Sequence, residues 1–166
     1  MKRFSALLCA LTLLLALTAC GGSASGDALP GISLEGAVLE QTVDTYSAET
    51  GKGIRFQVYS FPEAAPNLER EKAWAALPMD GTLISSLYGG PIQTSGGILC
   101  AAPLFADGEG VPLAPVFEHG YAMFRDRHPD AKANDPTILF DRDKLHFDLN
   151  VFDSDSGLLY LMSIDT

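Results

Sequence analysis

The chain has 166 residues, of which 47% are hydrophobic and 19% charged, and its formal net charge at pH 7 is −10. The hydrophobic fraction suffices for a globular core, and the acidic balance disfavours binding to nucleic acid or to anionic lipid surfaces. Since there are only three cysteines, we expect the fold to depend on its apolar core rather than on a disulfide framework.

The N-terminal residues have the layout of an export signal. The basic pair Lys2-Arg3 precedes an uncharged apolar run from Phe4 to Leu17, and small residues follow it. Even when extended to Ala19, this run has 16 residues, fewer than the about 20 that a transmembrane helix needs. The pattern therefore predicts a cleaved leader rather than a membrane span.

The segment Leu17-Thr18-Ala19-Cys20 resembles the lipobox of bacterial lipoproteins. In that family the cysteine thiol receives a diacylglycerol, and the leader is cut off just before the cysteine. The resemblance implies a signal peptide at 1–19, a lipidated Cys20 with a flexible Gly/Ser tether at 20–30, and a single extracytoplasmic globular domain at 31–166. Two acyl chains hold a protein stably on a membrane. We therefore expect localisation to the cell membrane, facing away from the cytoplasm, or to the outer membrane of a diderm host.

In chain order, the first predicted unit after the tether is a β-hairpin over 37–46 and 54–61. Both segments are rich in β-favouring residues, and glycines lie between them. A helix over 34–48 is the alternative, but Gly36 weighs against it. Residues 67–77 predict a short helix capped by Asn67, with Trp74 in its core.

The middle of the chain predicts two strands and a further helix. The apolar runs 82–88 and 98–105 lie between glycine-rich turns, which favours strands with long loops. Aromatic residues then recur at helical spacing, which predicts a helix that begins at Pro115 and stops before Pro129.

The C-terminal third predicts a three-stranded meander over 137–140, 145–152 and 158–164. If Phe152 pairs with Leu158 or Tyr160, the last strand is apolar on both sides. The second connecting turn and the 49–51 turn share an acidic, hydroxyl and glycine pattern, which predicts a glycine in the left-handed region.

Together these elements predict the α+β class, with one domain built mainly of antiparallel sheet from hairpins and a meander, and two or three short covering helices. From residue 116 onward, the order of a helix, the segment Arg-His-Pro-Asp-Ala-Lys and three strands resembles the PepSY domain of exported bacterial proteins, a module linked to peptidase modulation and binding. This resemblance implies an architecture and no site residue.

The sharpest polar constellation is His146, Asp148 and Asn150. At alternate positions of a strand they share one face, with about 6.6 Å between neighbours. They are candidates for a ligand-binding face. The alternative is that they are solvated or rim positions of an amphipathic strand.

Two other features are open to a chemical interpretation. The acidic loops 141–143 and 153–155 could offer carboxylates to calcium, but their spacing departs from the helix-loop-helix pattern and favours turn chemistry. Cys100 lies in an apolar run, which favours a buried structural thiol over the nucleophile of a thiol hydrolase. No pattern indicates a metal or a cofactor.

The sequence thus predicts a lipid-anchored binding or accessory module for an envelope partner, with no role in nucleic-acid binding. One alternative is a hydrolase or transferase that acts on envelope material. Another is a purely structural lipoprotein. The lipobox-like motif itself implies only one partner, the bilayer, to which diacylglyceryl Cys20 would anchor the chain.

Overall fold

The computed structural model describes residues 29–131 and 133–166. The predicted leader, Cys20 and most of the tether therefore lie outside the described residues. The strands are β1 (Val38–Asp44), β2 (Gly53–Ser60), β3 (Ala75–Ala76), β4 (Gly90–Thr94), β5 (Gly97–Ala101), β6 (Gly120–Asp126), β7 (His146–Asp153) and β8 (Leu158–Asp165). In the described part of the chain the helical elements are α2 (Gly81–Tyr88) and the 3-10 helix η1 (Pro136–Asp141).

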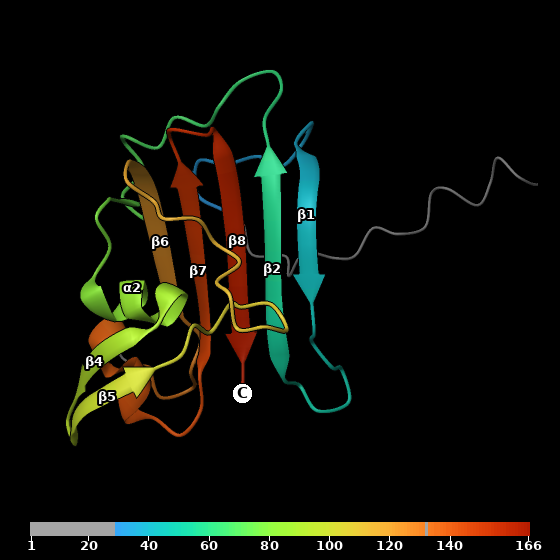
Figure 1. Cartoon of the computed structure of the whole chain (residues 1–166). Coiled ribbons are helices and arrows are strands. Elements are labelled where there is room, and N and C mark those ends of the chain that lie inside the picture. Colours follow the sequence, from blue (N-terminus) through green and yellow to red (C-terminus); the bar gives the residue numbers. More distant parts are fainter. Residues whose placement is uncertain (1–28, 132) are drawn as a thin grey trace, which may run out of the picture.

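Six strands form one antiparallel sheet in the order β1-β2-β8-β7-β6-β3, and β4 pairs with β5 as a separate hairpin (Figure 1). The predicted sheet-rich antiparallel architecture is confirmed, as are the β1–β2 hairpin and the last two strands of the meander. None of the helices in the described segments has the length and hydropathy that crossing a bilayer requires.

One face of the sheet, which we call the helix-covered face, packs against α2, η1 and the segment that contains Phe105 and Ala114. Amphipathic strands gain most of their stability by burying such a face. The largest fully buried sheet residues here are Phe56, Phe147, Leu149 and Met162. Both covering helices are short, and the hairpin β4–β5 lies beside them at one end of the sheet (Figure 1).

The opposite face, which we call the loop-covered face, is covered by irregular chain. Phe152 and Leu159 lie on it, and Leu68 and Trp74 pack over them. The indole Nε1 of Trp74 donates a hydrogen bond to the carbonyl oxygen of Pro30 at 2.8 Å. Trp74 is thus buried as predicted, but the helix predicted for 67–77 is wrong, because this segment consists of turns and the short strand β3.

The strand predicted over 82–88 is helix α2. Asp80 caps the helix, accepting a hydrogen bond from the Thr82 N–H at 2.7 Å, and Gly89 ends it at φ 78°. Leu83 and Leu87, four residues apart, both face the core. The spacing of these two leucines and the cap therefore explain the helix.

The helix predicted after Pro115 is also wrong, because its central residues form β6. Tyr121 and Met123 pack on the loop-covered face, whereas Ala122 and Phe124 pack on the helix-covered face. A strand that is covered on both faces carries apolar residues at most positions. Its aromatic residues therefore fit a helical period by coincidence.

The first strand of the predicted meander, 137–140, is the 3-10 helix η1, which starts at Pro136 and is capped by Asp135. The element order behind the likeness to PepSY domains, a helix followed by three strands, therefore differs from the observed order. The register differs too, because Phe152 pairs with Leu159 rather than with Leu158 or Tyr160. A shift of one residue moves a side chain to the other face. Tyr160 consequently lies on the helix-covered face.

The predicted turn chemistry is confirmed at two loops. Gly51 and Gly157 have φ of 66° and 70°, in the left-handed region that favours glycine. In the second loop, Asp153 accepts hydrogen bonds from the Asp155 N–H and the Ser156 hydroxyl. These carboxylate contacts are those of a turn.

Gly120, at the start of β6, permits a close approach between strands. Its φ is 143°, and a Cβ atom there would collide with the carbonyl oxygen of Phe152. We expect Gly120→Ala to lower the free energy of unfolding by more than ~1 kcal/mol, as measured by urea denaturation. The matched control is Gly81→Ala, where a Cβ meets nothing within 4 Å. Equal effects of the two substitutions would contradict this account.

Candidate functional site

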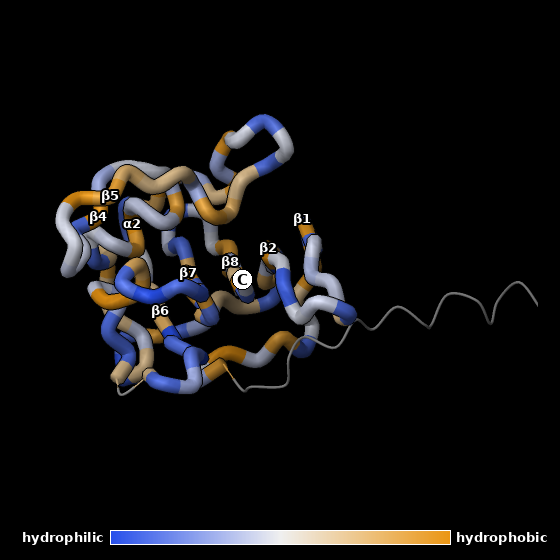
Figure 2. The backbone as a smooth tube through the Cα atoms, turned by 90° about the horizontal axis from the view of Figure 1, so that it is seen from below, coloured by the Kyte–Doolittle hydropathy of each residue, from blue (hydrophilic) through white to orange (hydrophobic). Residues whose placement is uncertain are grey.

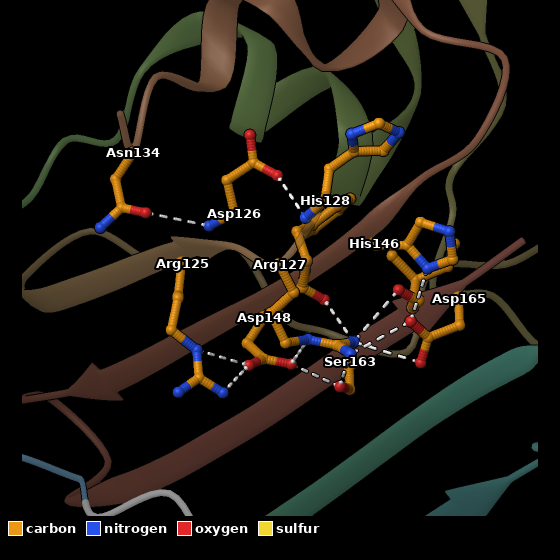
Figure 3. Close-up of polar contacts among 11 residues, drawn as sticks. Arg125, Asp126, Arg127, His128, Asn134, His146, Asp148, Ser163 and Asp165 are labelled. Atoms are coloured by element: carbon orange, nitrogen blue, oxygen red, sulfur yellow. Dashed lines mark hydrogen bonds and ion pairs between the residues drawn. The ribbon is translucent and has the colours of Figure 1, made fainter. Parts of the chain in front are cut away.

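Polar side chains form two rows across the end of the loop-covered face where β8 terminates (Figure 3). In the first row Arg125 of β6 lies opposite Asp148 of β7, which lies opposite Ser163 of β8. In the second row His146 lies opposite Asp165, and the backbone N–H of Arg127 donates to the carbonyl oxygen of His146 at 2.7 Å. Strand register thus brings these side chains together.

Asp148 is the centre of this polar cluster. Arg125 donates from Nε and Nη2 to Asp148 Oδ2, at 3.0 and 2.6 Å, and the Ser163 hydroxyl donates to Oδ1 at 2.5 Å. The Nε of Arg127 lies 2.8 Å from the same Oδ1, but its N–H makes no aligned hydrogen bond among the described residues, so this contact is Coulombic. Asp148 is only 8% exposed, and its charge is therefore neutralised from both sides.

Asp165 is the second anion of the cluster. Its Oδ1 lies 2.9 Å from Nδ1 of His146 and 3.1 Å from Nη1 of Arg127. Burial raises the pKa of Asp165, but hydrogen bonds and positive charge from His146 and Arg127 outweigh this and hold the pKa below its usual value. The ionised carboxylate is therefore the stable form at neutral pH.

A separate ion pair lies beside the cluster. The Asp126 side chain is fully buried, and Nη1 of Arg142 donates to its Oδ2 at 2.7 Å. The backbone N–H groups of His128 and Asp126 are bound by Asp126 Oδ1 and Asn134 Oδ1 respectively. The His128 ring centroid lies 5.9 Å from that of His146. The Asp126–Arg142 ion pair and the backbone hydrogen bonds beside it hold the chain as it leaves β6.

The cluster holds the ends of the strands together through paired charges. The arginines Arg125 and Arg127 are balanced by the carboxylates of Asp148 and Asp165, which leaves no net anion for a cation to neutralise. Within residues 29–131 and 133–166 no three His, Cys, Asp or Glu side chains are arranged to hold a metal ion. The geometry is that of a structural network.

The predicted ligand face is brought together on one side of β7, as alternation requires. Asp148 forms ion pairs with Arg125 and Arg127, and His146 contacts Asp165 through Nδ1. Asn150, opposite Met123 and Leu161, is 6% exposed. Asp148 and Asn150 are buried, whereas His146, at the end of β7, is partly exposed.

The sequence interpretation missed the two arginines of this cluster, because Arg125 and Arg127 fell inside a predicted helix. Their spacing of two residues places them on one face of a strand, and Ser163 and Asp165 have the same spacing in β8. The available signal was the opposite charge of Arg125 and Asp148, which lie opposite each other on the neighbouring strands β6 and β7.

An open groove lies on the helix-covered side between β1 and the segment that leads to β6. Its volume is about 460 Å³, and Glu40, Gln41, Tyr160 and residues 112–115 are among its lining residues. Ligand sites are commonly concave, with convergent polar groups. This groove is open and combines apolar walls with a single charged side chain, that of Glu40.

The sheet edges differ in how they are protected against pairing with another strand. β1 has a bulge between Leu39 and Gln41 and carries Glu40 and Asp44, two devices that block edge pairing. β3 is only two residues long. β5 has neither a bulge nor a charge, and in the described part of the chain it pairs with β4 alone.

The residues of β5 are unusually exposed for an apolar strand. Ile98 is 77% exposed and Leu99 is 43% exposed. Cys100 is exposed as well, so the prediction of a buried structural thiol is wrong. Alternation explains this, because Ile92 opposite Leu99 faces the core, whereas Ile98 and Cys100 face outward.

A second signal marks this hairpin. From Gly81 to Ala106 the chain contains no Asp, Glu, Lys or Arg, although the whole protein has 21 acidic and 11 basic residues. The hydropathy view shows hydrophobic chain at β5 on the outside of the molecule (Figure 2). An uncharged, apolar and exposed edge strand is a surface suited to pairing with another chain.

Comparison with known proteins assigns no family. The chain matches no protein-family model, no curated protein and no solved structure.

We expect Asp148→Asn to lower the free energy of unfolding by about 1–3 kcal/mol, because it weakens hydrogen bonds to charged partners in a partly buried site. The measurement is urea denaturation at pH 7. The control is Asp155→Asn, which removes an exposed pair with His119 and should leave stability nearly unchanged. Similar losses in both variants would show that the cluster contributes no more than a surface pair.

The lowered pKa of Asp165 makes stability depend on pH in a definite direction. Because the native pKa lies below the unfolded value, this contribution is present above about pH 4 and is lost as the pH falls through the native pKa. In Asp165→Asn we expect the free energy of unfolding to fall less steeply than in wild type as the pH is lowered below about 4. Parallel profiles from urea denaturation at each pH would refute the assignment.

Proposed function

We propose that this protein is a lipid-anchored, extracytoplasmic module that binds a protein partner of the cell envelope through strand addition at β5. In this proposal Cys20 carries a diacylglycerol, and the tether at 20–30 leads to the domain that begins near residue 31. The lipobox-like Leu17-Thr18-Ala19-Cys20 segment supports the anchor.

The single observation that carries the binding role is the contrast between the edges. β1 is protected by a bulge and by charges, whereas β5 presents an apolar, uncharged edge. Proteins that gain nothing from an open edge commonly block it. An unblocked β5 therefore favours a binding role for that strand.

The hairpin is also held in place before any partner arrives. The Ser95 N–H at its tip donates to Asp141 of η1 at 2.7 Å, and Thr94 Oγ1 donates to the Gly97 carbonyl oxygen at 2.9 Å. A preorganised edge loses less conformational entropy on binding than a flexible loop does. This geometry suits recognition of an extended segment.

The test is photo-cross-linking in cells that express the full chain. A p-benzoylphenylalanine residue replaces either Ile98 or Val116, which are 77% and 76% exposed. Position 98 should give a discrete cross-linked product, because it lies on the proposed edge, whereas position 116 should give none. Mass spectrometry identifies the product.

The anchor is tested in the same cells with Cys20→Ala. We expect this form to lose incorporation of an alkyne fatty acid and to lose the product from position 98. Equal products from positions 98 and 116 would argue against β5 as the binding edge. Unchanged lipid incorporation in Cys20→Ala would argue against the anchor.

A further inference from the structure

The hydrogen-bonding groups on the outer edge of β5 can be assigned from its pairing with β4. Pro91 lies opposite Cys100 and has no N–H, so this is a non-hydrogen-bonded position of the ladder. Alternation then directs the backbone groups of Leu99 toward β4. The backbone N–H and C=O groups of Ile98 and Cys100 consequently point away from β4, toward the open edge of the hairpin.

This edge is self-complementary. In an antiparallel pair of strands related by a two-fold axis, residues whose N–H and C=O groups point to the open edge must lie opposite residues of the same kind, because only these can form the hydrogen bonds between the two copies. The register that overlaps all five residues of β5 places Ile98 opposite Cys100 of a second copy, and the reverse. Leu99 then lies opposite Leu99 of that copy as a non-hydrogen-bonded pair, with Cα atoms about 4.5 Å apart.

Charge favours contact between copies at this edge. Two copies of this acidic chain repel each other, but no charged residue lies between Gly81 and Ala106, so this edge adds no like charges to the contact. The hairpin tip is Thr94 with Ser95 and Gly96, beside Asp141, which is unsuited to insertion into lipid. The apolar surface instead follows the strand.

The size of the edge limits the strength of pairing. Five residues span about 17 Å. The surface area that two strands of this length bury against each other falls well below the ~1,200 Å² of a stable interface. Dimers in dilute solution should therefore be scarce. Anchoring both copies in one membrane raises their effective concentration without adding any contact.

We propose that β5 pairs antiparallel with β5 of a second membrane-anchored copy of this chain, with Leu99 opposite Leu99. This inference rests on the proposed function, because it names a second copy as the partner at the same edge. The hairpins of two molecules then form one four-stranded sheet, and the pair is stable only where both copies are confined to a membrane.

The test is disulfide trapping with the full lipidated chain in phosphatidylcholine vesicles. Cys100→Ser removes the exposed native thiol, and Leu99→Cys introduces one at the proposed two-fold axis. Cα atoms about 4.5 Å apart are within disulfide range. Mild oxidation should yield a linked dimer on a non-reducing gel, about ten-fold more than from the same variant in solution as Cys20→Ala without residues 1–19.

The matched control is Ile98→Cys in the same Cys100→Ser background. Random collision would favour position 98, because Ile98 is more exposed than Leu99, at 77% against 43%. The proposed register favours position 99, because Ile98 lies opposite residue 100 of the second copy. Linkage at 98 equal to or greater than linkage at 99 in vesicles would overturn the pairing.

The design separates the two proposals. Preferential linkage at 99 in concentrated solution, unaffected by Cys20→Ala, would support edge pairing and overturn the need for an anchor. A lipidated chain that links at neither position, while Ile98 cross-links to a different protein in cells, would overturn self-pairing and leave the proposed function standing. Preferential linkage at 99 that requires the anchor supports both.

Discussion

The rest of the structure depends on one constraint, that the central strands must be covered on both faces. Every residue of β7 except His146 is buried, although the described residues supply only two short helices. These helices cover one face, and irregular segments anchored by Leu68 and Trp74 cover part of the other. Where that cover ends, the cluster around Asp148 replaces apolar packing with paired charges. Buried charges persist in proteins only when they are matched in this way.

The same constraint decides how much of the fold the sequence could predict. The strands β1, β2, β7 and β8 were predictable because runs of β-favouring residues bounded by turn residues mark them. β6 was not, because burial on both faces removes the alternation that distinguishes a strand from a helix. α2 was missed because its apolar run resembles a buried strand, and the Asp80 cap resembles part of a turn.

The candidate sites show a similar division. The shared face of His146, Asp148 and Asn150 follows from period-two geometry alone, but the ion pairs of Asp148 require Arg125 on the neighbouring strand β6 and Arg127 just after it. Register across strands is a long-range property that no local window contains. The uncharged stretch around β5 was visible in the sequence, yet an apolar run does not reveal whether it faces inward. Only the pairing with β4 shows that Ile98 and Cys100 face out.

The indole of Trp74 has a mechanical consequence for the molecule. Its bond to Pro30 and the packing of Leu29 and Ile32 over the loop-covered face fasten the chain before β1 begins. A force applied through the residues that precede Leu29 therefore reaches this clamp first, and the ladder between β1 and β2 does not bear the initial load. The contact between Trp74 and Pro30 thus shields the pairing of β1 with β2 from tension that enters through the residues before Leu29.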